Sequence, residues 1–292
     1  MSAPWRADED PEPALGGADA QARRPRAGAV LVPGQVRYQL LLLARSPLGT
    51  FISLVIPLML LVALDLVTPE MTLQSLGGVR VVQFLTPAMA SFAVLNAGFV
   101  DVLVGTTVAR EQGVLTRFES TPLPTWAYFA GRLVAAALVA ALAVAVVVGV
   151  GVLFLHAHLA ARALGGFVGV TALGLVVAFS LGVATSSVVH STEAALPVAY
   201  GILLPVAFIS EVFFPSPTET AWLRAVAAAL PVAPFAHGME AAFAVPPRSL
   251  TEGQLGVLLA WAAGALVLAL VTFRHQPGSP RRRRAPSPSS LQ

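Results

Sequence analysis

The sequence predicts an all-α membrane protein, and three observations carry that prediction. Of its 292 residues, 56% are hydrophobic and only 11% are charged, whereas a soluble domain has roughly 25% charged residues. The mean hydropathy is +0.77. The apolar residues are also gathered into separate runs, each close to the ~20 residues that a helix needs to cross a bilayer.

Six apolar runs between two polar tails predict six transmembrane helices. We expect these helices at residues 48–66, 82–105, 131–155, 165–189, 194–214 and 254–273. The tails, residues 1–33 and 274–292, are rich in proline and arginine and lack an apolar run, which predicts disordered cytoplasmic segments. The chain therefore divides into one membrane domain, residues 34–273, with a polar tail at each end.

All of the positive side chains are arginine, because the chain contains no lysine. An even number of spans puts both tails on the same side of the membrane. With the tails inside, fourteen of the eighteen arginines fall on the cytoplasmic side, which is the bias that cytoplasmic segments show. The predicted topology is therefore N-in and C-in. The same distribution accounts for the pI of about 10.1 without nucleic-acid binding.

Two further segments are apolar but unsuited to crossing the membrane. Residues 36–45 form a short run flanked by arginine, which predicts a helix lying in the inner interface before the first span. Residues 218–243 are longer but are interrupted by proline. They predict re-entrant or interfacial helices at the outer mouth, between the fifth and sixth spans.

The only long charged segment between two spans begins at Arg110. Beyond it, Val114, Leu115 and Phe118 fall on one side of a helix, and two prolines then end that helix. From these residues alone, two interpretations are equally open. The helix either docks on a soluble cytoplasmic partner or rests on lipid headgroups.

Several kinds of chemistry are excluded by residue type. Without cysteine there is neither a thiol nucleophile nor a disulfide, and without lysine there is no Walker A loop or Schiff-base lysine. His156 and His158 have spacing compatible with a metal, but no third ligand has a predictable place. A membrane enzyme is therefore the least favoured hypothesis, and we predict no metal or cofactor site in this chain.

Ionisable side chains are scarce inside the predicted spans, and those present, such as Asp101 and Glu193, lie near span ends. An ion-coupled carrier usually needs charged groups near the midplane, so an ion-coupled transporter or channel is the second hypothesis. The interior polar residues are mild, namely Asn96, Ser91, Thr171, Ser180 and Ser187. They favour a mainly apolar pathway with some hydroxyl groups, suited to apolar or amphiphilic cargo.

Small residues recur at every fourth position in two spans. One row is Ala137, Ala141, Ala145 and Gly149, and the other is Gly174, Ala178, Gly182 and Ser186. Rows of this kind let helix backbones approach closely, so both predict tight helix packing.

Three segments, in this order, carry a family resemblance. The first is residues 37–62; the second is Arg110-Glu111, Gly113, an apolar-basic helix, Thr-Pro-Leu-Pro at 121–124 and Gly131-Arg132-Leu133; the third is residues 202–243. Together they resemble the interfacial helix and first span, the cytoplasmic loop, and the fifth span and outer region of type-2 ABC transporter permeases. The chain departs from the family pattern in having one Arg-Glu pair where two are common, and Glu211 where a small residue is common.

The resemblance implies a bacterial cell-membrane permease of an exporter, of the drug- or antibiotic-efflux kind. ATP and Mg²⁺ would bind a separate ABC ATP-binding subunit, and the permease would act with a second copy or a sister permease. The resemblance also implies a coupling helix from Glu111 to Phe118. The residues implied in coupling to the ATPase are Arg110, Glu111, Gly113, Val114, Leu115, Arg117 and Phe118. Those implied in the outer re-entrant region are Phe213, Phe214, Pro215, Trp222 and Pro231.

Overall fold

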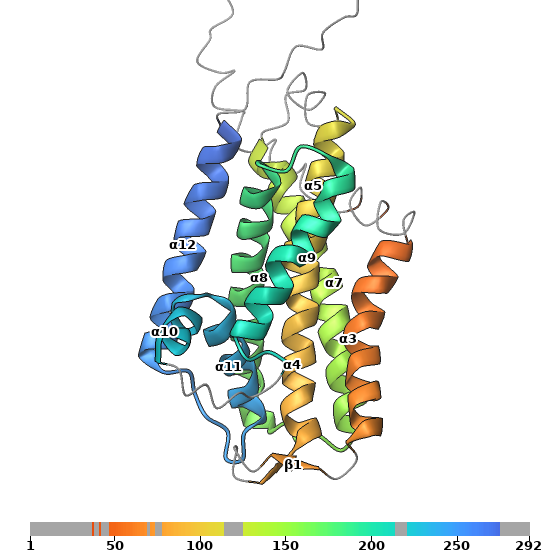
Figure 1. Ribbon diagram of the computed structural model, residues 1–292, viewed down its shortest axis with the longest axis vertical. Helices are drawn as coiled ribbons and strands as arrows, with labels where there is room; N and C mark the ends of the chain where they lie inside the picture. Colours follow the sequence, from red (N-terminus) through yellow and green to blue (C-terminus); the bar gives the residue numbers. More distant parts are fainter. Residues whose placement is uncertain are drawn as a thin grey trace, which may run out of the picture.

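The structure, a computed structural model, describes residues 47–68, 71–73, 78–113, 125–213 and 221–274, together with Arg37 and Leu41. Within this part of the chain nearly all residues are helical, and the helices stand side by side in an elongated bundle (Figure 1). The predicted all-α fold is confirmed. Both predicted tails, apart from Arg274, and most of the predicted interfacial helix lie outside the described residues.

The helices follow one another along the chain with short connections. They are α3 (Pro47–Val67), α4 (Val81–Leu95), α5 (Asp101–Glu111), α7 (Thr125–Leu153), α8 (Leu164–Ser186), α9 (Thr192–Ile209), α10 (Ala221–Ala229), α11 (Val232–Phe243) and α12 (Glu252–Arg274). A π-helix, η2 (Asn96–Val100), joins α4 to α5, and a 3₁₀ turn, η3 (Ala161–Ala163), precedes α8. Two short strands, β1 (Thr72–Leu73) and β2 (Val79–Arg80), lie between α3 and α4.

Five helical segments of the described residues are long and apolar enough to cross a membrane. They are Val81–Glu111, Tyr128–Leu153, Ala161–Ser186, Thr192–Ile209 and Glu252–Ala269. The first predicted span corresponds to α3, which has 21 residues and is therefore about 31 Å long. Its apolar part within the described residues, Leu54–Val67, is shorter.

Three boundaries differ from the predicted spans by five residues or more. The second span continues to Glu111, the third begins at Thr125 and the fifth ends at Ile209. Because the second helix continues past residue 105, Asp101 stands at the start of the eleven residues of α5. The prediction that Asp101 lies near a span end is therefore wrong. The helix continues beyond the end of the apolar run, because contacts made by the last residues of the helix hold its final turns in place.

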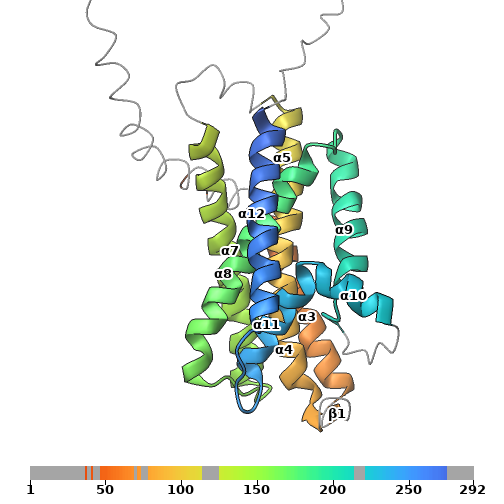
Figure 2. The same cartoon turned by 90° about the vertical axis from the view of Figure 1, so that its left-hand side faces the viewer.

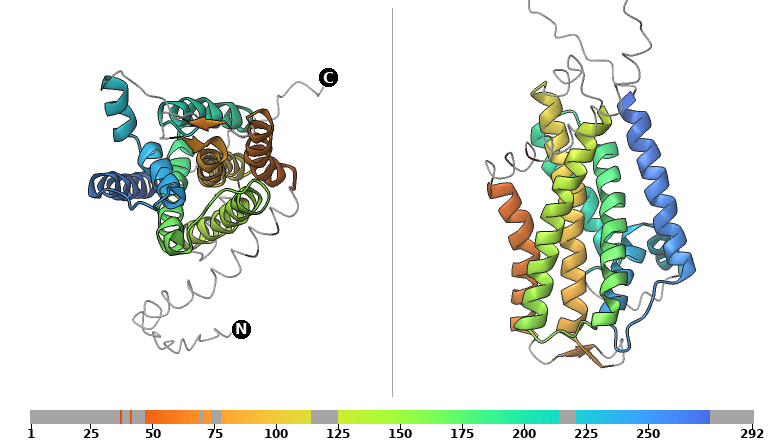
Figure 3. Two further views of the ribbon diagram at one scale, coloured as in Figure 1. Left: turned by 90° about the horizontal axis from the view of Figure 1, so that it is seen from below. Right: turned by 180° about the vertical axis from the view of Figure 1, so that it is seen from behind.

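The continuous helix from α4 through η2 to α5 is the axis of the bundle. The helix α4 packs against α3, α7, α8 and α11, and α5 packs against α8 and α9. Seen from the hairpin end, α4 lies among the other helices (Figure 3, left). Its side chains from Phe84 to Leu95 are all buried, so this helix carries the core of the bundle.

The row of small residues on α8 is tightly packed, as predicted, and two of its members, Ala178 and Gly182, meet η2. A Cβ atom added at Gly182 would lie 2.8 Å from the carbonyl oxygen of Phe99, and one added at Gly98 would lie 2.7 Å from the Cβ of Ala178. These distances leave no room for a side chain on either glycine. The two helix backbones therefore approach as closely as small-residue rows allow.

The row on α7 does not behave in the same way, and its prediction is wrong. Ala141 and Ala145 are exposed, and a Cβ atom at Gly149 would meet nothing within 4 Å. The helix instead turns Ala140, Val144 and neighbouring residues toward the core. Spacing alone indicates a row of small residues, whereas the packing of the other helices decides which face is covered.

The two short strands form a feature that the sequence did not predict. They pair antiparallel, with Thr72 opposite Arg80 and Leu73 opposite Val79. Each strand has only two residues, too few for an alternating pattern to be recognised. The hairpin caps one end of the bundle, opposite the end at which α12 finishes (Figure 1).

The region predicted as re-entrant or interfacial helices consists of α10 and α11, which meet at an angle of 85°. Both lie in the half of the bundle that holds the hairpin (Figures 1 and 2). Pro231 precedes α11 as its N-cap residue, so the chain bends where proline was expected to interrupt it. The broken helices that the sequence predicted are therefore present.

Candidate functional site

The helix α5 ends at the end of the bundle opposite the hairpin. We call the charged segment of residues 114–124, which follows α5 in the sequence, the connector, and we call this end of the bundle the connector end. Gly113 has a φ of +67°, and its N–H donates to the carbonyl oxygen of Arg110 at 3.0 Å. Glycine adopts this left-handed conformation readily and commonly ends a helix. The continuous helix predicted from Glu111 to Phe118 is therefore wrong at its start. Val114, Leu115, Arg117 and Phe118 lie outside the described residues.

Arg110 binds the end of α8. Its Nη1 donates to the carbonyl oxygen of Ser186 at 2.5 Å and to that of Val189 at 3.5 Å. The last carbonyl groups of a helix have no partner within the helix, and arginine near such an end can bond to them. Arg110 therefore caps the C-terminus of α8 from a different helix.

Glu111, the next residue, binds the start of α9. Its carboxylate Oε2 accepts from the backbone N–H of Thr192 at 3.0 Å and from the Thr192 hydroxyl. The N-cap residue of α9, Ser191, makes no side-chain capping bond. A carboxylate is also favoured at a helix N-terminus by the helix dipole. Glu111 therefore supplies the cap that α9 lacks in its own sequence.

A second polar contact joins α9 to the π-helix. The Tyr200 hydroxyl donates to Asn96 Oδ1 at 2.9 Å, and Asn96 Nδ2 donates to the carbonyl oxygen of Phe92 at 2.9 Å. Asn96 is only 1% exposed, so these bonds satisfy a polar group buried in the bundle. Single-turn π-helices are frequent at functional sites.

Arg132 lies inside α7 rather than at the opening of a span. Its Nη2 donates to the carbonyl oxygens of Asp101 and Val102, at 3.3 Å each, and its Nη1 donates to the Tyr128 hydroxyl at 3.3 Å. The guanidinium therefore ties α7 to the first turn of α5. The side chain acts within the bundle and is not part of the free connector.

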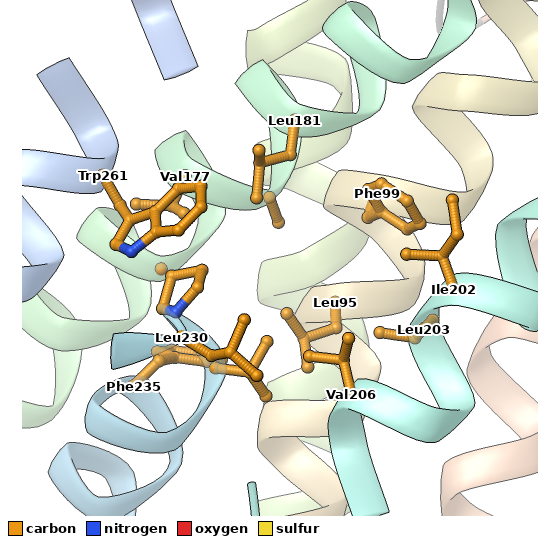
Figure 4. Close-up of a pocket in the computed structure, with 14 residues that line it drawn as sticks. Leu95, Phe99, Val177, Leu181, Ile202, Leu203, Val206, Leu230, Phe235 and Trp261 are labelled. Atoms are coloured by element: carbon orange, nitrogen blue, oxygen red, sulfur yellow. The ribbon is translucent and has the colours of Figure 1, made fainter. Parts of the chain in front are cut away.

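A cavity of about 180 Å³ lies between α8, α9, α11 and α12 beside the π-helix. Its lining is Leu95, Phe99, Gly174, Val177, Ala178, Leu181, Ile202, Leu203, Val206, Leu230, Pro231, Val232, Phe235 and Trp261. Trp261 and Phe235 face Phe99 and Ile202 across it (Figure 4). Ile202 is 42% exposed, so this wall of the cavity lies at the surface of the bundle.

The chemistry of the cavity is apolar. The indole Nε1 of Trp261 donates to the carbonyl oxygen of Ala229 at 2.8 Å, which leaves the ring itself to line the cavity. The hydroxyl groups expected along a pathway do not line it. Ser91 and Thr171 instead donate to carbonyl oxygens of their own helices, at 2.8 and 2.7 Å. The cavity can hold hydrocarbon and offers no partner to a small ion.

The outer residues implied by the resemblance occupy different places. Phe213 stacks edge-on against Phe92, with ring centroids 5.1 Å apart, and also contacts Phe208. Trp222 is 67% exposed on α10, whereas Pro231 is buried and lines the cavity. Phe214 and Pro215 lie outside the described residues. Of the members of this set that the structure describes, only Pro231 therefore meets the cavity.

Gln83 joins three segments at the hairpin end, and sequence reasoning missed it. Its Nε2 donates to the carbonyl oxygens of His158 and Phe243, at 2.7 and 2.5 Å, and its Oε1 accepts from the His158 N–H at 2.7 Å. The side chain thus links the start of α4, the loop before α8 and the end of α11. A single glutamine in an apolar run carries no signal of such a role.

The histidines considered as metal ligands lie in this same loop. Among the described residues, no group of three or more His, Cys, Asp or Glu side chains could hold a metal ion. The backbone of His158 is held by Gln83. The backbone of this loop therefore takes part in the contact that Gln83 makes between three segments.

The fold and these contacts define a multi-pass α-helical membrane protein with an apolar cavity between its helices. The family model of the ABC-2 type transporter matches residues 35–244, which is more than half of the chain. The chain belongs to this family and is a membrane permease component of an ABC transporter. The family in general implies an ABC ATP-binding partner. No curated protein matches the chain.

Proposed function

We propose that the chain is the membrane-spanning subunit of an ATP-driven exporter that carries apolar or amphiphilic substrates. The observation that supports this proposal best is the connector end. There α5, which continues the most buried helix of the bundle, ends at a turn and passes into a charged connector. A connector that continues the central helix of the bundle is well placed to receive movement from a soluble ATP-binding subunit.

The connector after Gly113 supplies the proposed contact with the ATP-binding subunit. Val114, Leu115 and Phe118 would present an apolar face, with Arg117 beside it, while Arg110, Glu111 and Gly113 join that face to the bundle. The chain has no lysine and hence no Walker A loop, so nucleotide binding falls to the partner. Differential contact in its two nucleotide states would bias the permease between conformations.

The cavity supports the proposed substrate class. Its side chains are apolar, and its one indole N–H is already bonded. A charged or strongly polar group would lose its hydration there without compensation. The apolar part of a substrate would fit this cavity, and a polar head would remain outside it. Efflux of drugs or antibiotics is a use of such a site that the family resemblance favours.

Assembly and placement complete the proposal. Six spans are half of the usual set for an ABC transporter, so the permease would act with a second copy or a sister permease in the bacterial cell membrane. Arg110 in the last turn of α5 and Arg274 at the end of α12 lie at the connector end, whereas Arg80 lies in the hairpin and Arg162 in η3. The arginine-rich C-terminal tail would accompany the connector end inside the cell.

Reconstitution in proteoliposomes tests the function. The permease is co-purified with its ABC ATP-binding subunit, and movement of a fluorescent amphiphile is followed with ATP, without ATP and with a proton ionophore. We expect transport to stop without ATP and to survive the ionophore. Transport that ignores ATP but collapses with the proton gradient would instead assign the protein to the ion-coupled carriers.

The docking site has its own test. Phe118→Ala should weaken co-purification of the ATP-binding subunit, because the apolar face of the connector loses its largest side chain. Phe154→Ala, which changes an exposed apolar residue directly after the end of α7 at Leu153, is the control and should leave co-purification unchanged. Equal recovery of the partner with both variants would contradict docking through this face.

A further inference from the structure

The consecutive residues Arg110 and Glu111 cap two different helices on either side of one turn. Arg110 bonds to the last carbonyl groups of α8, and Glu111 bonds to the first residue of α9, Thr192. The start of α9 has no side-chain cap of its own, because Ser191 makes no capping bond. The turn between α8 and α9 is thus held by the last turn of α5.

The helix α9 is otherwise weakly held. Only 22% of its apolar window is buried, compared with 83% for the helix from Val81 to Glu111. Its polar attachments among the described residues are Glu111 with Thr192 at one end and Asn96 with Tyr200 near the middle. Both attachments reach the same axial helix, one at Glu111 near its end and the other at Asn96 in its middle.

The helix α9 also forms one wall of the cavity, through Ile202, Leu203 and Val206. A shift of its capped end would therefore change the cavity. The attachment of Tyr200 to Asn96 lies between the cap and these residues, at a point about which α9 could tilt. Coupling between two sites requires an element whose position both sites bias. The helix α9 is such an element, because it contacts the end of α5 at one site and lines the cavity at the other.

We propose that Arg110 and Glu111 are positioning residues that transmit movement of the connector to α9, and through α9 to the cavity. Glu111 acts through Thr192 and makes no contact with the ATP-binding subunit. The inference rests on the proposed function, because it needs a partner that moves the connector. Gly113 ends α5 two residues later, so a displacement of the connector acts directly on the turn that carries both caps.

The test removes the cap from each side. Glu111→Ala removes the acceptor. Thr192→Pro removes both the N–H and the hydroxyl that Glu111 accepts from, and proline is tolerated at the first position of a helix. Ser191 has φ −118° and ψ 134°, the extended conformation that a residue before proline prefers. The double variant completes the cycle, and Glu193→Ala, an exposed carboxylate in the same turn of α9, is the matched control.

Three quantities are measured in proteoliposomes: recovery of the ATP-binding subunit, ATP hydrolysis, and substrate moved per ATP hydrolysed. We expect each single variant to lower substrate moved per ATP about two- to fivefold, the scale of one solvent-exposed contact with a charged group, with recovery of the partner unchanged. The double variant should be no worse than either single variant, because both remove the same contact. Glu111→Gln, which keeps an acceptor oxygen, should recover most of the coupling, and Glu193→Ala should match the wild type.

Other results would overturn the inference. If Glu111→Ala reduces recovery of the ATP-binding subunit, or if its effect multiplies with that of Thr192→Pro, then Glu111 contacts the partner directly. If Thr192→Pro fails to insert, Thr192→Ala removes only the hydroxyl and should give an intermediate loss; wild-type coupling there and in Glu111→Ala would refute the capping role. Failure of the wild-type chain to bind any ATP-binding subunit would instead defeat the proposed function.

Discussion

The axial helix from Val81 to Glu111 and the helix α9 are both apolar, yet they are held in different ways. The axial helix is 83% buried over its apolar window and α9 only 22%. The axial helix packs against α8 through small residues that leave no space between the backbones. The buried face of α9 is a single stripe of Ala195, Ala199, Leu203 and Ala207, supplemented by two polar contacts.

The difference separates a rigid element from an adjustable one. Close packing over a whole helix resists displacement because every contact must be remade together. A helix held by a narrow stripe of buried residues and a few hydrogen bonds can tilt while losing few stabilising contacts. The bundle therefore combines a fixed axis with a movable wall, and the cavity lies between them.

The largest expected effect comes from filling the contact between the axis and α8. Gly182→Leu forces a side chain against the carbonyl oxygen of Phe99, where even a Cβ atom would lie at 2.8 Å. We expect a loss of about 3 kcal/mol of stability, the upper part of the range for overpacking, seen as a lower midpoint in thermal unfolding in detergent. Gly201→Leu on α9 is the control, because its Cβ would meet nothing within 4 Å. Similar midpoints for the two variants would remove the distinction between the helices.

The next effect concerns the cavity wall. Val206→Trp places an indole in a cavity of about 180 Å³ and should lower transport by roughly tenfold or more, the equivalent of about 1.4 kcal/mol of binding. Recovery of the ATP-binding subunit should be unchanged. Leu204→Trp adds the same group on an exposed position of α9 and should transport normally. If Val206→Trp transports as well as Leu204→Trp, the cavity is not part of the pathway.

A smaller effect is expected at the middle attachment of α9. Tyr200→Phe removes the donor to Asn96 Oδ1 and leaves a buried oxygen with one partner fewer. We expect a loss of about 1 kcal/mol, measured by unfolding in detergent. Asn96→Ala and the double variant complete a cycle in which the two losses should not add. Full additivity would show that Asn96 and Tyr200 stabilise the bundle independently.

The smallest effect should occur at the hairpin end. Gln83→Ala breaks three bonds to His158 and Phe243, but water can reach two of these partners. We expect a loss of about 0.5–1 kcal/mol, with faster hydrogen exchange in residues 155–160 and unchanged exchange in α9. Faster exchange in α9 as well would show that the two ends of the bundle are coupled. That result would contradict the separate roles of Gln83 at the hairpin end and of Glu111 and Asn96 in holding α9.

Much of the fold could be predicted because it depends on local composition. Six apolar runs and an outer segment interrupted by proline can be recognised in the sequence, and the structure contains the corresponding helices. The sequence placed the end of the second span too early, whereas the structure extends this helix to Glu111. The last residues, Arg110 and Glu111, are polar, and their contacts with α8 and α9 could not be inferred from the local sequence. The hairpin was missed because its strands have two residues each.

The sequence by itself determined a membrane-embedded helical chain without a Walker A loop, because hydrophobicity and missing residue types need no knowledge of neighbours. Tertiary structure decided which helix faces which. Glu111 meets Thr192 across 81 residues, and Tyr200 meets Asn96 across 104. No spacing rule reaches so far along a chain, and an apolar cavity made by five segments leaves no pattern in any one of them. The caps and the cavity exist only because packing brings these distant residues together.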